Sequence, residues 1–490
     1  MRRSGRQAVL KPRRRPNHPA PLAWRSGLLR VANSIKWTIS VAALYAAAAC
    51  GTIPNSFAIL HSRLLYRESP KFVGEHGPLS RAQGIEVVAA LQQRADQPDL
   101  LKRQLEFQQA IGAGPLVLGN KVTLLENGPD TYNAMFSALK SAKDSINIET
   151  YIISDDRIGR EFADQLIEKQ QQGVQVNLIY DSFGSMAVNQ SFFDRLQSSG
   201  IRVLQFNPVN PLVGRLRWAP SHRDHRKLMV IDGRIVFTGG INISGVYSSG
   251  WRRRKRVPYG TLDYWRDTDV EIEGPVAAEF QKVFFSTWES QKGGPLSPRD
   301  YFPELKNAGD EIVQVQGSVP EQFSLIYFTL ISAINNAVTN VYISDAYFAP
   351  DQQFVEALSA AARRGVDVRL LVPAKTDVPF ILAAARSHYL ELLDAGVKIY
   401  EWRGKMMHAK TATVDHVWST VGSSNLDWWS IVYNNELNAV VLGSHFGAQM
   451  DLMFRNDMEG SDQIKLSDWQ KRSLVERVDE SIARMLQPVL

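Results

Sequence analysis

The sequence carries one short pattern twice, as HRKLMVID at 225–232 and as HAKTATVD at 408–415. Each copy contains a histidine, a lysine two residues later and an aspartate five residues after the lysine, namely His225, Lys227 and Asp232, then His408, Lys410 and Asp415. The agreement continues, because a glycine follows each aspartate after seven residues and an asparagine after ten: Gly239 and Asn242, then Gly422 and Asn425. Only nine histidines occur in 490 residues, so two in one register indicate a duplicated functional unit.

The residues before each copy repeat one order of helices and strands. In the first unit we expect helices at 129–143 and 157–172, strands at 146–153 and 174–181, and a helix–strand pair within 188–207. In the second unit we expect helices at 321–337 and 351–364 and strands at 340–348, 366–373 and 397–402. The runs GVQVNLIYD and GVDVRLLVP are similar although they lie outside the motif. Repetition and alternation together predict a duplicated α/β fold with helices covering a central sheet.

The domain organisation expected from these patterns has five parts. They are a basic leader with an apolar segment (1–60), a helical lead-in (61–120), a first lobe (121–290), a connector rich in Gly and Pro (291–320) and a second lobe (321–490). The second lobe is expected to end in an amphipathic helix at 467–489. A chain of this length is too long for a single hydrophobic core, which agrees with two lobes.

The charge of the chain is distributed unevenly. The formal net charge is +6, but residues 1–36 carry ten Lys and Arg and no acidic residue. Without this leader, 46 basic residues stand against 50 acidic ones, a net charge of −4. A mildly acidic body argues against nucleic acid as the partner, because nucleic-acid-binding domains are usually basic. The basic run at 251–256 is either a solvated insertion or a contact for anionic headgroups.

An apolar, uncharged stretch at 37–50 follows the basic leader. Its 14 residues are short for a spanning helix, which needs about 20, and suit the apolar core of a secretory signal. It ends in AAAC, with Cys50, and this resembles the lipobox of bacterial lipoproteins, in which the cysteine is acylated. The alternative is an uncleaved anchor that extends to Leu60. In either case the positive-inside rule places the body across the membrane, on the periplasmic side.

Two motif copies together suit the chemistry of a phosphodiester. Within each motif the histidine and lysine are two residues apart on an expected strand, so their side chains point to one face. Lysine binds the anion, while histidine attacks phosphorus or transfers a proton. Two copies related by pseudo-twofold symmetry would bring one histidine to each side of a phosphorus. One would form a phosphohistidine and the other would act as acid and base.

Further residues have expected roles around this centre. We expect the two lysines, with Asn242 and Asn425, to hold the nonbridging oxygens, and Gly239, Gly240 and Gly422 to let the backbone approach the phosphate. Asp267 and Glu436, in WRDTDVEIEG and YNNELNAVV, are expected to orient the histidines. Asp232 and Asp415 take part in the chemistry or form turns.

His222 and His225 do not predict a metal site, because Arg223, Arg226 and Lys227 would repel a cation. No nucleotide-binding motif occurs, so no cofactor is expected.

The doubled motif, followed by GGIN and GSSN, resembles the phospholipase D superfamily and, within it, the bacterial cardiolipin synthases. The phrases HRKLMVIDGRIVFTGGINIS and WRDTDVEIEGP carry the resemblance, which covers roughly 120–490. It implies two α-β-α sandwich lobes related by a pseudo-twofold, with one active site at their interface. It also implies a membrane-associated phosphatidyltransferase with His225 as nucleophile and His408 as acid and base. Many cardiolipin synthases carry two spanning helices at the N-terminus, whereas this chain has one short apolar segment.

The expected substrates are phospholipids, such as phosphatidylglycerol, and an alcohol acceptor, with no nucleic acid. The site residues do not distinguish an alcohol from water, so a phospholipase D that releases phosphatidic acid is the alternative. A nuclease and a non-enzymatic lipid-binding scaffold are further alternatives. The acidic body argues against the nuclease, and two intact motifs argue against the scaffold.

Overall fold

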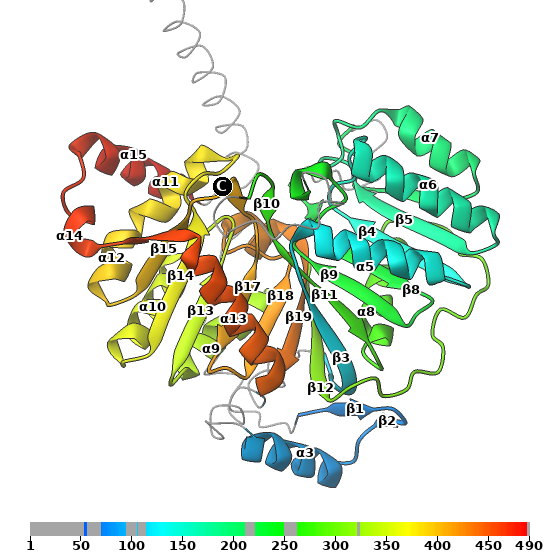
Figure 1. The fold of residues 1–490 in the computed structure, drawn as a ribbon, viewed down its shortest axis with the longest axis horizontal. Helices are drawn as coiled ribbons and strands as arrows, with labels where there is room; N and C mark the ends of the chain where they lie inside the picture. Colours follow the sequence, from blue (N-terminus) through cyan, green and yellow to red (C-terminus); the bar gives the residue numbers. More distant parts are fainter. Residues whose placement is uncertain are drawn as a thin grey trace, which may run out of the picture. The chain divides into compact units, whose positions relative to one another are not determined.

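The computed structural model describes residues 53–55, 70–94, 105, 114–210, 221–248, 262–320 and 324–487 (Figure 1). The basic leader, the apolar stretch with Cys50, part of the expected helical lead-in and the basic run at 251–256 lie outside these ranges. Within the described ranges, no helix is both long and apolar enough to cross a bilayer.

The first lobe is built on a mixed sheet of seven strands. Three parallel strands at one edge, β6 (Arg202–Phe206), β5 (Gln175–Asp181) and β4 (Ser145–Thr150), are followed by antiparallel β8 (Lys227–Ile231), β9 (Ile235–Gly239), β11 (Thr268–Glu273) and β3 (Leu116–Glu126). Every residue of β4, β5 and β8 is buried, so the sheet is covered on both faces at these central strands.

The second lobe repeats this sheet strand for strand. Its order is β15 (Lys398–Trp402), β14 (Asp367–Pro373), β13 (Asn340–Ser344), β17 (Thr411–Val414), β18 (Trp418–Gly422), β19 (Asn434–Leu442) and β12 (Glu311–Ser318). One additional strand, β20 (Ser461–Ile464), extends the edge at β15. The seven shared strands have the same order and directions, so the duplication predicted from the motif extends over whole lobes. Strands β3 and β12 also pair with each other and join the two sheets.

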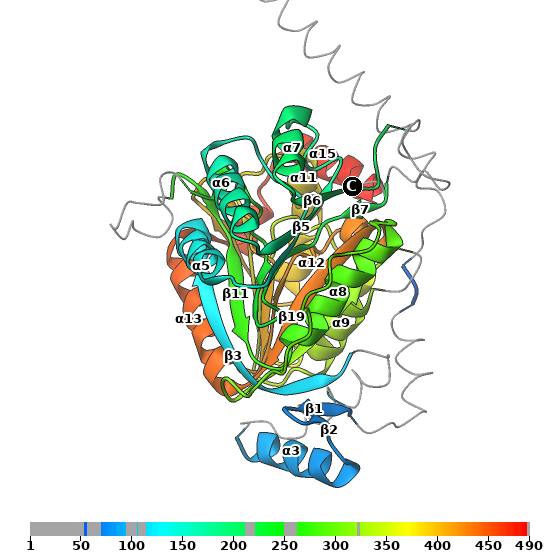
Figure 2. The same ribbon diagram turned by 90° about the vertical axis from the view of Figure 1, so that its right-hand side faces the viewer.

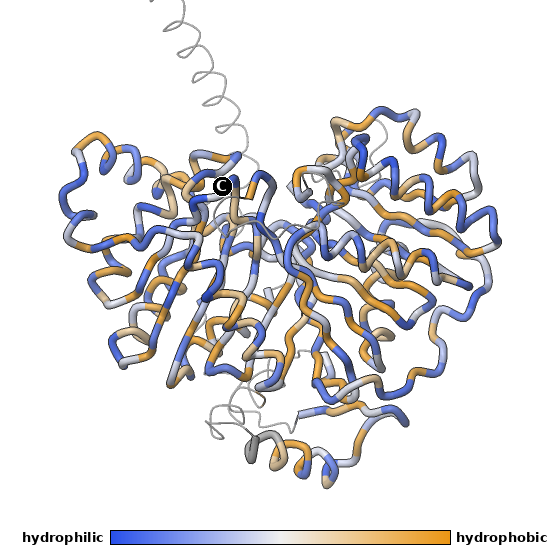
Figure 3. The backbone as a smooth tube through the Cα atoms, viewed as in Figure 1, coloured by the Kyte–Doolittle hydropathy of each residue, from blue (hydrophilic) through white to orange (hydrophobic). Residues whose placement is uncertain are grey.

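Helices cover the outer face of each sheet, and the inner faces meet. On the first lobe the outer helices are α5 (Asn127–Ser141), α6 (Arg157–Gln171) and α7 (Gln190–Ser198). On the second they include α9 (Leu325–Asn336), α10 (Gln352–Arg363) and α12 (Tyr389–Asp394). A third core includes side chains of the inner strands and of α8 (Ala277–Ser290) and α13 (Ser444–Glu459), one helix from each lobe. Figure 2 shows these two helices on opposite sides of β3, β11 and β19. Each lobe is thus an α-β-α sandwich, as predicted, and the two share an apolar seam. The interior strands are predominantly hydrophobic (Figure 3).

The helix boundaries follow local capping chemistry. The side chains of Asp156 and Asp351 accept backbone N–H groups at the starts of α6 and α10. Gly173 and Gly365 follow the ends of these helices with φ of 92° and 95°. A left-handed backbone is the usual helix terminator, and glycine adopts it without a steric cost. Equivalent helices therefore begin and end with the same chemistry in both lobes.

Three segments differ from the sequence-based expectation. The expected connector ends in strand β12, which lies within the sheet because its alternating side chains pair with β19 and β3. The expected helical lead-in also contains β1 (Phe72–Gly74) and β2 (Gly77–Pro78) beside α3 (Arg81–Arg94). The expected closing helix is two helices, α14 (Leu466–Trp469) and α15 (Leu474–Met485), because the Ser473–Glu476 capping box starts a new helix.

Candidate active site

The two motifs meet through two short parallel bridges between the lobes. Strand β7 (Arg223–Asp224) pairs with the first residues of β19, and β10 (Trp265–Arg266) pairs with β16 (Met406–Met407). The next residue in each of these four segments belongs to the site. His225 therefore lies opposite Glu436, and Asp267 lies opposite His408. The arrangement is reciprocal, since each lobe supplies a histidine to one pair and a carboxylate to the other.

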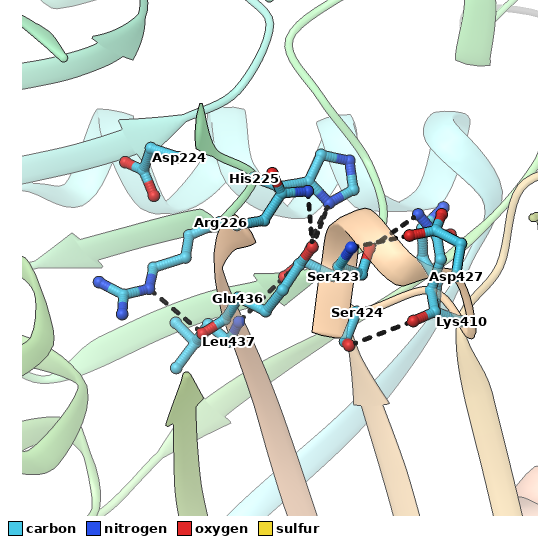
Figure 4. Close-up of polar contacts among 12 residues, drawn as sticks. Asp224, His225, Arg226, Lys410, Ser423, Ser424, Asp427, Glu436 and Leu437 are labelled. Carbon is cyan, nitrogen blue, oxygen red and sulfur yellow. Dashed lines mark hydrogen bonds and ion pairs between the residues drawn. The ribbon is translucent and has the colours of Figure 1, made fainter. Parts of the chain in front are cut away.

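Each histidine contacts the carboxylate of the opposite lobe through Nδ1. In the first dyad, His225 Nδ1 lies 3.0 and 3.1 Å from the two oxygens of Glu436. In the second, His408 Nδ1 lies 2.6 Å from Asp267 Oδ2. Ser423 donates a further hydrogen bond to Glu436 (Figure 4). Because a carboxylate fixes Nδ1 as the protonated nitrogen, Nε2 of each ring is the nitrogen directed to chemistry.

The histidines precede the strands on which the sequence placed them. Strand β8 starts at Lys227 and β17 at Thr411, so His225 and His408 lie just before them. Their backbone N–H groups instead donate across the seam, from His225 to Asn435 at 3.0 Å and from His408 to Arg266 at 2.6 Å. The interlobe bridges thus fix both the backbone and the ring of each histidine.

Each lysine lies beside the histidine of its own motif. Lys227 Nζ donates to the carbonyl of His225, and Lys410 Nζ donates to the carbonyl of His408. Lys410 Nζ also lies 3.0 and 3.1 Å from the two ring nitrogens of His408. Tyr151 packs edge-on against His225, with ring centroids 4.9 Å apart. Lys227 lies over the ring of Tyr151.

Burial and the two lysines depress the basicity of the site. Burial lowers the pKa of Lys227 to about 7, and the charge of Lys410 acts in the same direction. Burial also lowers the pKa of Lys410. For His408, burial together with Lys410 and Lys227 lowers the pKa well below its ordinary value. Positive charges held close together in a buried site destabilise one another. A bound phosphate anion would stabilise them.

The two dyads differ in the state of their carboxylates. Burial alone would raise the pKa of Glu436, but the charge and hydrogen bond of His225 outweigh it and the pKa is lowered. Burial raises the pKa of Asp267 to about 6, although Lys410 opposes the shift. The pKa of His225 is lowered by burial, with Glu436 opposing. The His225 dyad therefore holds the more firmly ionised carboxylate.

Asp232 and Asp415 lie away from the reacting groups, and the expectation of a catalytic role is corrected. Each follows the far end of the strand that begins beside its lysine, in a left-handed conformation with φ of 51° and 49°. The Asp232 carboxylate accepts the backbone N–H groups of residues 143–145. The Asp415 carboxylate accepts those of residues 338–340 and the hydroxyl of Thr339. Both are turn-forming residues that tie a helix end to the strand after it.

The three glycines make room for side chains of neighbouring strands. A Cβ on Gly240 would lie 2.1 Å from Asp267 Oδ1, and one on Gly239 would lie 2.1 Å from Asp269 Oδ1. A Cβ on Gly422 would lie 2.1 Å from Asn438 Oδ1. These contacts require glycine at all three positions, and the expected approach of the backbone to the phosphate stays a prediction. Glycine at position 240 leaves the space that the Asp267 carboxylate occupies, and this carboxylate contacts His408.

Asn242 and Asn425 are buried beside the dyads. Asn242 Oδ1 accepts the N–H of Ile152, and its Nδ2 donates to Tyr247 Oη at 2.9 Å. An amide NH₂ has two donors, so this contact uses one of them. Asn425 Nδ2 lies 3.4 Å from Ser430 Oγ. Both amides therefore have structural partners, and their phosphate-binding role stays a prediction.

Aromatic residues around His408 were not foreseen from the sequence. The rings of Tyr247, Trp265 and Tyr347 lie with centroids 5.6, 5.1 and 5.9 Å from that of His408. Tyr247 Oη also lies 3.4 Å from His408 Nδ1. They contribute to the burial of the ring, which lowers the pKa of His408 together with the charges of Lys410 and Lys227. Trp265 is the first residue of the WRDTD phrase, which was the available signal in the sequence.

Two buried arginines, Arg226 and Arg266, bind the backbone of the dyad carboxylate residues, and these contacts were also not foreseen from the sequence. Arg226 Nε donates to the carbonyl of Glu436 at 3.2 Å (Figure 4). Its other nitrogens donate to the hydroxyl of Thr287 and the carbonyl of Ser318. Arg266 donates to the carbonyl of Asp267 and forms two 2.8 Å hydrogen bonds to Asp457 of the opposite lobe. Each guanidinium thus holds the main chain of one dyad carboxylate.

Comparison with known proteins assigns this geometry to a family. The family model described as "Cardiolipin synthase, PLD-like domain" matches residues 135–254 and 330–458, one stretch in each lobe. The cardiolipin synthase of Alkalihalophilus pseudofirmus is 34% identical over 393 residues, which cover 79% of this chain and 76% of the relative. The chain belongs to the cardiolipin synthase family of phospholipase D-like proteins. The cardiolipin synthase of Geobacillus kaustophilus is 33% identical with the same coverage.

A solved structure supports the fold of this family member. The phosphatidylserine synthase of Haemophilus influenzae aligns with a TM-score of 0.54, at 14% identity, over 75% of this chain and 95% of that one. At this identity the likeness concerns the fold. The resemblance to the phospholipase D superfamily and the duplicated fold predicted from the sequence are thus confirmed.

Proposed function

We propose that this member of the cardiolipin synthase family is a phosphatidyltransferase that exchanges phospholipid headgroups through a covalent intermediate on His225. One observation carries the proposal: two His–carboxylate dyads, assembled crosswise from two lobes, lie in a single buried site with two lysines. Chemistry at one phosphorus needs a nucleophile and a separate acid and base, and the duplication supplies both.

In the first half-reaction, Nε2 of His225 attacks the phosphorus of a phospholipid such as phosphatidylglycerol. The bond from phosphorus to the headgroup oxygen breaks, and protonated His408 gives its proton to the departing alkoxide. Glycerol leaves, and the phosphatidyl group remains on His225. We assign His225 as the nucleophile because its partner Glu436 has a lowered pKa, and an ionised carboxylate on Nδ1 makes Nε2 more electron-rich.

In the second half-reaction, an alcohol takes the place of the departed headgroup. His408 removes the proton from the incoming hydroxyl, the oxygen attacks phosphorus, and the bond to His225 breaks. One phosphodiester replaces another, so the exchange needs no nucleotide. Lys227 and Lys410 are proposed to hold the nonbridging oxygens, with Asn242 and Asn425 as further donors. A bound phosphate would raise the pKa of His408 by offsetting the lysine charges that depress it.

Phospholipid substrates place the protein at a bacterial membrane. The acceptor that we propose is the free glycerol hydroxyl of a second phosphatidylglycerol, so that cardiolipin is the product. Water as acceptor would give phosphatidic acid instead. His408 must activate the acceptor, and the aromatic side chains around its ring shield it from solvent. This shielding disfavours water as the acceptor.

The test is to incubate the purified full-length protein with phosphatidylglycerol vesicles and to identify every product. Cardiolipin with an equal amount of glycerol is the expected result. Phosphatidic acid as the sole lipid product would overturn the transferase assignment in favour of hydrolysis. The His408→Asn variant serves as the control for contaminating activity, and we expect it to form neither product.

A further inference from the structure

Helix α15 displays its apolar side to solvent. Leu474, Val475, Val478, Ile482 and Met485 are 48 to 77% exposed. On a helical projection these five positions form one stripe. The opposite side faces the protein, where Ala483 packs against Ile381 and Ala384 of the neighbouring helix and Glu480 forms a 3.2 Å salt bridge with Arg472. A helix on a globular protein normally buries its apolar stripe, so α15 has the reverse orientation.

This orientation is held by specific contacts. The capping box at Ser473 and Glu476 begins the helix, and Arg484 donates to Gln352 Oε1 at 2.9 Å near its end. Gln487 donates to the carbonyl of Pro350 at 2.8 Å. Isolated exposed apolar side chains are ordinary, whereas a continuous stripe on a fixed helix marks an interaction surface.

The helix lies at the end of the lobes that carries the active site. In Figures 1 and 2, α15 and α7 occupy the same end, and Figure 1 shows β10, which precedes Asp267, between them. Other exposed apolar side chains are Phe183 and Met186, in the segment between β5 and α7, and Val246 in η1 (Gly245–Tyr247). Apolar residues are thus exposed in both lobes at this end.

The first residues that the structure describes, 53–55, contact the segment that anchors α15. The Pro54 carbonyl accepts a hydrogen bond from Gln353 Nε2 at 3.2 Å. The neighbouring residue, Gln352, is the one that holds Arg484 of α15. The uncharged apolar stretch at 37–50 ends only three residues before Ile53. Residues 53–55, which follow this stretch in the sequence, are thus held beside the residue that anchors α15.

We propose that α15 lies in the interfacial region of the phospholipid bilayer that supplies the substrate, with its apolar stripe among the acyl chains. The proposal rests on the phospholipid substrate proposed above and adds the surface by which the catalytic lobes face the membrane. Amphipathic helices of this kind bind in the plane of the interface through the apolar area they bury.

The direct test uses photocross-linking and does not depend on enzyme activity. A benzoylphenylalanine is introduced at position 478 or 482 of the full-length protein, which is reconstituted in phosphatidylglycerol vesicles and irradiated. We expect phospholipid adducts at both positions. The matched control is position 363, an exposed residue at the other end of the helix that begins at Gln352, and we expect no adduct there. Equal lipid labelling at 478 and 363, or protein–protein adducts at 478, would overturn the proposal.

A kinetic test separates docking from chemistry. Val478→Glu combined with Ile482→Glu should raise the apparent KM for vesicle phosphatidylglycerol by about tenfold or more. Its rate on short-chain phosphatidylglycerol below the micelle concentration should stay unchanged, and so should both rates in the Arg363→Glu control. An equal loss on both substrates would overturn the proposal. If no transferase activity exists at all, the photocross-links still report on α15, so the two proposals fail separately.

Discussion

At the scale of single residues, the site consists of two similar dyads with unequal electrostatics. Glu436 keeps a lowered pKa because His225 and Ser423 stabilise its charge, whereas burial raises the pKa of Asp267 to about 6. The sequence identified both histidines and both carboxylates. It did not indicate which carboxylate serves which histidine, because the crosswise contact arises only when the lobes associate.

The dyads predict unequal effects for two isosteric substitutions. Glu436→Gln should lower kcat about 10²–10⁴-fold with little change in KM, because an amide cannot stabilise the positive charge on the His225 ring. Asp267→Asn should leave formation of the covalent intermediate intact for a substrate with a good leaving group, and slow its transfer to the acceptor. Single-turnover kinetics check both statements. Equal losses in both half-reactions for both variants would contradict the assigned roles.

Anion binding should depend on pH through Lys227, whose pKa burial lowers to about 7. The protonated ammonium binds phosphate and the neutral amine does not. Affinity for a phosphate analogue such as tungstate should therefore be greatest below about pH 7 and fall as pH rises through the pKa. Titration calorimetry in two buffers should also show proton uptake on binding near pH 7. Constant affinity from pH 6 to 9 would contradict the depressed pKa.

At the scale of secondary structure, the motif aspartates act as turn residues. Alternation, glycine terminators and the internal repeat predicted most strands and outer helices to within a few residues. The strand β12 was missed because its Gly- and Pro-rich neighbours suggested a connector, and its alternating residues are buried only by contact with both lobes. The sequence also did not distinguish a turn-forming role from a catalytic role for Asp232 and Asp415, because the residue type and spacing are the same in both cases.

The turn role predicts a loss of stability with activity retained. Asp232→Asn keeps a side chain that tolerates the left-handed backbone, but it weakens the charged acceptor of three backbone N–H groups. We expect a loss of about 1–3 kcal/mol in the free energy of unfolding and near-normal kcat for the folded protein. Chemical denaturation and activity on the same sample measure this. A kcat as low as that of His225→Asn, with normal stability, would restore the catalytic reading.

At the scale of the whole molecule, the two lobes depend on each other for catalysis and for stability. Arg266 and Asp457 form a fully buried bidentate pair between β10 and α13 of opposite lobes. Duplication in the sequence predicted one shared site. The buried arginine pair could not be predicted, because the two residues are 191 positions apart and only the packed seam brings them together.

This pair predicts a thermodynamic cycle. Arg266→Met alone should cost about 3–5 kcal/mol, because it leaves the Asp457 carboxylate buried without a partner. Adding Asp457→Leu should recover part of that loss by removing the orphaned charge. Urea denaturation of the two single variants and the double variant gives the coupling free energy. Strictly additive losses would show that the pair does not act as a unit.

The central claim is that His225 carries the covalent intermediate while His408 only moves protons. A phosphatidyl ester of p-nitrophenol tests it directly, since that leaving group departs without a proton. With His408→Asn, we predict a burst of one equivalent of p-nitrophenol and a stable phosphatidyl adduct on the peptide that contains His225, found by mass spectrometry after alkaline quenching. With His225→Asn, we predict neither. An adduct on His408 in the His225→Asn variant, with none in His408→Asn, would contradict the account.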